Sequence, residues 1–171
     1  GIVLPVKNFI NDSYCRDIST KVKSQFEVKR KNGECIAPFA LYGYKKAEYN
    51  RNQLVVDEYA AEIVQKIFTW KIEGVAVSAI ADKLNGLGIL SPKEYKKSTG
   101  ENYKGGFSGA AKSMWSSATV KRILTNEMYL GHMVQGKTEK INYKLKKSVE
   151  KSEEEWIKVE NTHEARLSRI C

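Results

Sequence analysis

The chain has 171 residues, of which 42% are hydrophobic, and a formal net charge of +9 at pH 7. This length supports one good core, or one core and an extended arm. No apolar run approaches the ~18 residues of a membrane span, so we expect no membrane partner. The excess of positive charge favours a polyanionic partner, because cations that contact phosphates release counterions. The alternative is a soluble domain that is merely basic.

Cysteine and histidine are too sparse to predict a metal centre. Cys15, Cys35 and Cys171 lie far apart without a Cys-x-x-Cys pair, and the only histidines are His132 and His163. A structural zinc site needs about four ligands at close spacing, so we expect no metal and no cofactor. Sparse cysteines are typical of the reducing cytoplasm, which is the location we expect.

Residues 7–31 are expected to form one long helix. Apolar side chains recur there every four residues, at Ile10, Tyr14, Ile18, Val22 and Phe26. The spacing predicts one narrow apolar stripe on an otherwise polar rod. Such a helix packs against a partner or another domain rather than inside a core.

Three cations, Lys29, Arg30 and Lys31, close this helix before a stop at Asn32 and Gly33. The negative C-terminal end of the helix explains one or two of these charges. We expect the cluster to contact phosphates or the minor groove of DNA.

The next part of the chain is expected to be extended over 34–44 and then helical. Asp57 opens a helix that Glu73-Gly74 closes, and Ser78 caps a short helix that ends at Asn85-Gly86. Residues 91–113 are polar and rich in Gly, Ser and Lys, which predicts a long loop. A loop of this length is often functional, and the alternative is a solvated connection.

The helix predicted over 116–126 is the candidate DNA-reading element. Val120, Ile123 and Leu124 fall on one side of it, toward the core. The candidate DNA-contacting residues occupy the rest of the helix: Ser117, Ala118, Thr119, Lys121, Arg122 and Thr125. Arginine can bond guanine edges or phosphates. An ordinary amphipathic surface helix is the alternative.

Two strands are expected after this helix, over 132–135 and 156–159. The lysine-rich residues between them, from Lys137 to Lys151, predict a hairpin with a basic tip. Lys137 and Lys140 are its candidate DNA contacts. The alternative is a solvated charged face, because Glu153–Glu155 offset part of the charge.

Several motifs follow one another in a recognisable order. Residues 8–23 belong to the long helix expected above, and 38–44 read Pro-Phe-Ala-Leu-Tyr-Gly-Tyr. A spaced set comes next: Ile67-Phe-Thr-Trp70, Gly74, Ile80-Ala-Asp-Lys-Leu-Asn85, Gly88-Ile89, Trp115, Val120, Ile123-Leu-Thr-Asn126 and Tyr129-Leu-Gly131. Over residues 6–137 the chain resembles the large serine recombinases, which are site-specific DNA integrases and transposon resolvases. The matching parts are their connecting helix, their Pro-Phe/Tyr-Gly-Tyr motif, here with two extra residues, and their recombinase DNA-binding domain.

The resemblance implies a serine nucleophile in a resolvase-type domain that precedes residue 1. That serine attacks a phosphodiester and forms a 5′-phosphoseryl intermediate, while arginines stabilise the transition state. We therefore expect this chain to be a DNA-binding fragment without catalytic residues. The parent is expected to act as a dimer or tetramer on DNA, and the fragment as a monomer. The zinc ribbon typical of the family is expected to be absent, because residues 162–171 differ from its usual lead-in.

The fold class expected is mainly α with a small antiparallel β element, a helix-turn-helix-like domain preceded by a long helix. We divide the chain into a connecting helix (1–33), a recombinase DNA-binding domain (34–160) and a C-terminal tail (161–171). The expected function is binding of double-stranded DNA at one half of a recombination site, for integration or excision of a mobile element. A helix-turn-helix transcription regulator is the alternative.

Overall fold

The computed structural model describes residues 2–103, 111–145 and 147–166. These residues form two compact units. The helix–hairpin unit contains Gly1–Ile36 and His132–Thr162, and the helical unit contains Ala37–Gly131 and His163–Cys171. Parts of the expected loop (104–110) and of the expected tail (167–171) lie outside the described residues. The expected fold class is confirmed, because helices predominate and the strands form small antiparallel pairs.

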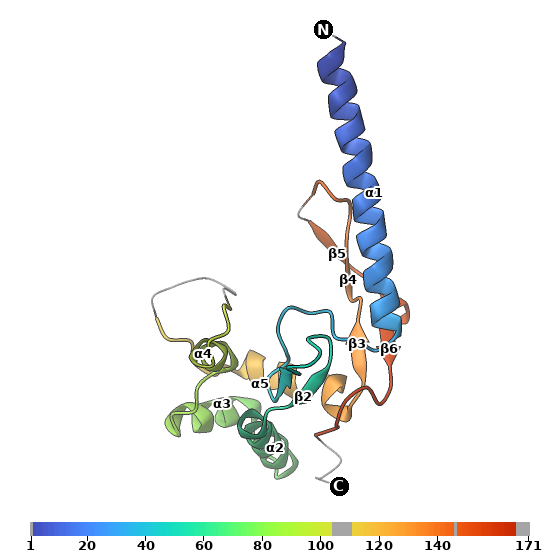
Figure 1. The fold of residues 1–171 in the computed structure, drawn as a ribbon. Coiled ribbons are helices and arrows are strands. Elements are labelled where there is room, and N and C mark those ends of the chain that lie inside the picture. Colours follow the sequence, from blue (N-terminus) through green and yellow to red (C-terminus); the bar gives the residue numbers. More distant parts are fainter. Residues whose placement is uncertain (1, 104–110, 146, 167–171) are drawn as a thin grey trace. The chain divides into compact units, whose positions relative to one another are not determined.

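The helix–hairpin unit begins with one long helix, α1, over Val3–Lys31 (Figure 1). It starts four residues before the expected position and ends at Lys31 with Asn32 as its C-cap, as the Asn-Gly signal predicts. Gly33 follows at φ +76°, a conformation that glycine adopts without strain. A Cβ at this position would lie 2.5 Å from Cγ2 of Thr162, so glycine is also required by packing.

The apolar stripe of α1 is exposed and does not run straight. Ile10 and Tyr14 are 59% and 65% exposed, and Ile18, Val22 and Phe26 are all more than 40% exposed. A helix turns by about 100° per residue, so a spacing of four residues advances by about 40° at each step. The stripe therefore winds around the helix instead of forming one face.

Two strand pairs complete the helix–hairpin unit. β3 (Met133–Gln135) pairs antiparallel with β6 (Ile157–Val159), which confirms the two strands expected there. Between them, β4 (Thr138–Lys140) pairs with β5 (Ser148–Glu150) as the expected hairpin, followed by a 3₁₀ turn, η2, at Glu153–Glu155 (Figure 1). The Gln135 side chain donates to the Glu34 carbonyl at 2.7 Å and accepts from the Ile36 N–H at 3.0 Å, which joins β3 to the chain after α1.

The helical unit contains the remaining helices, shown in green and yellow in Figure 1. Its elements are β1 (Tyr44–Lys46), β2 (Leu54–Val56), α2 (Glu58–Ile72), α3 (Val77–Gly86), α4 (Pro92–Ser98), α5 (Ser117–Leu124) and the 3₁₀ helix η1 (Glu127–Leu130). α2, α3 and α5 pack against one another. The core consists of fully buried side chains from these helices and η1: Val64, Ile67, Ile80, Leu84, Val120 and Tyr129. Asp57 caps α2 by accepting from the Ala60 N–H, as expected.

Three local expectations need correction. Ser78 lies inside α3 and does not cap it, because the Ala76 carbonyl already accepts from the Ile80 N–H at 3.0 Å. The expected loop contains a helix, α4, which Ser91 caps by accepting from the Glu94 N–H and which has Pro92 at its first turn. The antiparallel pair β1–β2 was not expected. Within the described residues, no helix is both long enough and apolar enough to cross a membrane.

Candidate nucleic-acid interface

α5 separates a buried side from an exposed side, as its sequence predicts. Val120 is fully buried and Ile123 is 5% exposed, while Leu124 is half-buried. Ala118 and Arg122 lie on the exposed side one turn apart. A small residue beside an arginine allows the helix to approach a groove closely while the guanidinium reaches beyond the backbone.

The flanks of this exposed side also carry polar groups. Ser117, Lys121 and Thr125 are exposed, and Thr119 is half-buried. Ser116 precedes the helix, and its hydroxyl accepts from the Thr119 N–H at 3.3 Å. The Thr125 hydroxyl donates to the Lys121 carbonyl at 3.0 Å, so it is partly committed to the end of α5.

The start of α5 is fixed to the end of α3 by one side chain. The Asn85 amide donates to the Trp115 carbonyl at 3.0 Å and accepts from the Trp115 N–H at 2.9 Å. The Trp115 indole N–H donates to the Ile89 carbonyl at 3.0 Å, and the Trp115 side chain is only 3% exposed. These hydrogen bonds connect the end of α3 to the start of α5 across the inserted residues.

The insertion that carries α4 is closed at its base. The Ser91 hydroxyl donates to the Ser113 carbonyl at 2.9 Å, and the Glu94 carboxylate accepts from the Ser113 N–H at 3.2 Å. Glu94 also pairs with Lys97 at 3.0 Å, and the hydrogen bond from Lys97 is the main cause of its lowered pKa. These contacts give the insertion its own local stabilisation.

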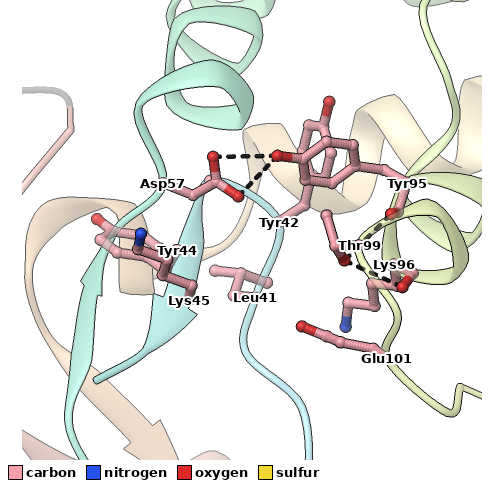
Figure 2. Close-up of a pocket in the computed structure, with 10 residues that line it drawn as sticks. Leu41, Tyr42, Tyr44, Lys45, Asp57, Tyr95, Lys96, Thr99 and Glu101 are labelled. Carbon is pink, nitrogen blue, oxygen red and sulfur yellow. Dashed lines mark hydrogen bonds between the residues drawn. The ribbon is translucent and has the colours of Figure 1, made fainter. Parts of the chain in front are cut away.

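A small cavity of about 210 Å³ lies where α4 meets the segment around β1 and the start of α2. Figure 2 shows the Tyr95 hydroxyl against the carboxylate of Asp57, at 2.9 Å from Oδ2 and 3.1 Å from Oδ1. Burial, and then this hydrogen bond, raise the pKa of Tyr95 to about 12. Lys96 lies over the Tyr103 ring at 5.0 Å, and burial lowers its pKa. The Tyr95–Asp57 pair joins α4 to the cap of α2, which is a structural role.

The other candidate contacts belong to the helix–hairpin unit. Lys29 and Arg30 are half-buried at the end of α1, and Lys31 pairs with Glu27 at 2.8 Å. Lys137 lies over the Trp156 ring at 4.5 Å, and Lys140 is exposed on β4. The structure thus places five candidates on α5 and Thr125 at its C-cap, and the remaining five candidates belong to the other unit.

Sequence reasoning missed two sets of contacts. The Asn85–Trp115 hydrogen bonds link residues that are 30 positions apart, and only the turn-like Asn85-Gly86 pair signalled them. The second set is at the hairpin tip, where Tyr143 and Lys144 bind Asp12 of α1. Among the described residues, no group of three His, Cys, Asp or Glu side chains is arranged to hold a metal ion.

Comparison with known families assigns most of the chain to one family. Residues 58–169 match the family model described as Recombinase, which is more than half of the chain. The chain belongs to the Recombinase family, and the family resemblance expected from its motifs is confirmed. The match begins at α2 and extends past residue 137, where the resemblance was expected to end. Neither the comparison with curated proteins nor that with solved structures gives a match.

Proposed function

We propose that this chain binds double-stranded DNA with α5 as the recognition helix of an expanded helix-turn-helix. The observation that carries the proposal is the division of α5: Val120 and Ile123 are buried against the helical unit, while Ala118 and Arg122 are exposed. In a helix-turn-helix, a first helix supports a second one that enters the major groove. α3 takes the first role, and the Asn85–Trp115 hydrogen bonds replace the short turn.

Arg122 is assigned to base recognition, and the other polar groups of α5 to the DNA backbone. An arginine that bonds O6 and N7 of guanine discriminates between bases by about 1–3 kcal/mol. Ser117, Thr119, Lys121 and Thr125 can contact phosphates near the helix, which positions the protein without reading sequence.

The cations of the helix–hairpin unit are assigned to phosphates. Lys29, Arg30 and Lys31 follow one another at the end of α1, and Lys137 and Lys140 belong to the hairpin. Each neutralised phosphate releases counterions, so these contacts would contribute affinity for any duplex and a dependence on salt.

Membership of the Recombinase family supports a role in site-specific DNA recombination. We propose that the chain places a serine-nucleophile catalytic domain of the same parent protein on one half of a recombination site. On this proposal, the breakage of the phosphodiester belongs to that domain, and the residues described here bind and position DNA.

The experiment that tests the proposal is selection of duplexes from a random pool with the 171-residue chain, followed by binding measurements. We expect one enriched half-site, bound at least ~10³-fold more tightly than random duplex of the same length. Supercoiled DNA that carries the site should remain unbroken. No enrichment would contradict sequence-specific binding, and strand breaks with protein linked to the 5′ end would contradict the assignment of chemistry to another domain.

A further inference from the structure

The tip of the β4–β5 hairpin holds an anionic group of the protein itself. Lys144 Nζ lies 2.7 Å from Oδ1 of Asp12 on α1, and the Tyr143 hydroxyl donates to the same oxygen. Arg16 lies further off, with Nη2 3.7 Å from Oδ2 of Asp12. One carboxylate oxygen therefore accepts from two neighbouring side chains of the tip.

The backbone of the tip fixes these two donors next to each other. The side-chain oxygen of Asn142 accepts from the N–H groups of Lys144 and Leu145, at 2.9 and 2.8 Å. This arrangement is an Asx turn, which holds the chain in a tight bend. The bend presents the ammonium of Lys144 and the hydroxyl of Tyr143 to one acceptor.

An ammonium and a hydroxyl that share an anionic oxygen also suit a phosphate oxygen. Hydrogen bonds from a cation to carboxylate and to phosphate have similar lengths and strengths. The hydrogen bond from Lys144, and then that from Tyr143, lowers the pKa of Asp12, so this carboxyl is ionised at neutral pH. The carboxylate thus has the charge that a phosphodiester would bring to the same donors.

The contact is accessible and easily exchanged. The Lys144 side chain is 62% exposed and that of Asp12 is 34% exposed. Exposed ion pairs stabilise proteins little, and salt screens them. A duplex, in contrast, offers a row of phosphates whose neutralisation releases counterions. Lys144 and Tyr143 should therefore bind a phosphate in preference to Asp12 once DNA lies beside the tip.

Charge and space around the contact agree with such an exchange. Residues 137–151 contain six lysines and two glutamates, which gives this segment a net charge of +4. A groove of about 450 Å³ lies beside the contact, between the tip and the face of α1 that carries Arg16 and Lys23. Lys23 pairs with Glu139 of β4 at 3.7 Å, an exposed contact of the same weak kind.

We propose that Tyr143 and Lys144 form a phosphate-binding site on the hairpin tip, which Asp12 occupies in the free protein and a backbone phosphate of duplex DNA occupies in the complex. The inference rests on the proposed function, because DNA is its ligand. Asp12 then acts as an internal competitor for the same two donors until DNA is bound.

Asp12→Asn tests the competition, and Asp17→Asn is the matched control. Both remove one negative charge from α1, but Asp17 lies five residues on, about 140° around the helix from Asp12. We expect Asp12→Asn to bind all duplexes about two- to fivefold more tightly than Asp17→Asn, with an unchanged ratio between selected and random DNA. Lys144→Gln should weaken binding to all duplexes and reduce the salt slope by about one.

A spectroscopic readout separates exchange from a general effect of charge. In the wild-type chain, the side-chain carboxyl ¹³C signal of Asp12 should shift when DNA is added, and that of Asp17 should not. Equal affinities for Asp12→Asn and Asp17→Asn, or an unmoved Asp12 signal in the complex, would overturn the inference. If these results occur while α5 variants still lose sequence preference, the proposed function stands without this site. A wild-type chain that binds no duplex would instead refute the proposed function and the site together.

Discussion

The side chain of Asn85 forms two hydrogen bonds with the backbone of one residue, Trp115, at 2.9 and 3.0 Å. Asn85 is near the end of α3, and Trp115 comes just before the serine that caps α5. The pair therefore holds the end of α3 next to the start of α5, as a short turn would, although about thirty residues intervene. This arrangement explains how the unit accommodates the inserted α4 while α3 and α5 remain packed together.

We expect Asn85→Ala to lower the free energy of unfolding by about 1–3 kcal/mol, because it leaves a buried N–H and carbonyl of Trp115 without these partners. Denaturant unfolding measures the change. Asn11→Ala, at an exposed position of α1, is the control and should alter stability by less than ~0.5 kcal/mol. Equal effects of the two substitutions would show that the Asn85–Trp115 link does not support the fold.

Substitution of Gly131 by alanine is expected to destabilise the protein more than the same substitution at Gly74. Both have positive φ, at +90° and +88°, but a Cβ at Gly131 would lie 2.8 Å from the His163 carbonyl oxygen, and one at Gly74 would meet nothing within 4 Å. Gly74→Ala should cost about 1–2 kcal/mol from backbone strain alone. Gly131→Ala should cost ~1–3 kcal/mol more, because the backbone of the 163–166 segment must shift. Thermal unfolding of both variants checks this, and equal losses would contradict the close packing of that segment.

Alkaline pH should destabilise the helical unit through Tyr44. Its hydroxyl donates to the Glu164 carbonyl at 2.8 Å, and burial raises its pKa to about 12. The unfolded value is about 10, so the neutral folded form contributes stability that is complete below pH ~10 and is lost as pH rises toward 12. The slope in that window should be about 1.4 kcal/mol per pH unit for this group.

Tyr44→Phe should remove the contribution of this group to the slope and leave that of Tyr95, whose pKa is also raised to about 12. The substitution should cost about 1 kcal/mol at neutral pH for the lost hydrogen bond. Denaturant unfolding at several pH values between 9 and 12 gives both quantities. Tyr14→Phe, which removes a hydroxyl from an exposed ring, is the control. If the two variants have the same pH dependence as the wild type, the burial of Tyr44 does not contribute to the alkaline loss of stability.

Periodicity and caps predicted most helices and the hairpin. The elements that they did not predict were missed for physical reasons. The amphipathic pattern of α5 predicted both its buried and its exposed side, because a surface helix has a regular period. α4 lacks an apolar stripe, and only Ser91 and Pro92 signalled it. The pairing of β1 with β2 was not predicted, because Leu54–Val56 is a short apolar run without alternation and has no strand signature of its own.

Contacts between distant residues could not be predicted from local patterns. Asp12 and Lys144 meet only after the hairpin folds back toward α1, and neither residue has a neighbour in sequence that signals the other. The same applies to the buried Arg166, which lies 4.0 Å from Glu58. Such pairings depend on tertiary structure, which the local sequence pattern around each residue does not indicate.

The end of α1 is expected to bind DNA without regard to sequence. Replacing Arg30 and Lys31 together with alanine should weaken binding to all duplexes alike and reduce the salt slope by about one to two. The control is the double variant Lys7→Ala and Lys21→Ala on the same helix, which removes the same charge. Titrations at several salt concentrations measure the affinity and the salt slope of the two double variants. Loss confined to the selected site would contradict a phosphate role, and so would equal slopes for the two double variants.

The most direct test of sequence reading by α5 measures how Arg122→Ala changes binding to the selected half-site and to random duplex. Arg122 is exposed on α5, so its loss should leave the melting temperature nearly unchanged. Lys121→Ala, one residue away, is the control for a phosphate contact and should weaken binding to both duplexes equally. We expect Arg122→Ala to cost about 1–3 kcal/mol of binding free energy on the selected site and little on random DNA. Equal losses on both duplexes would contradict sequence reading by α5.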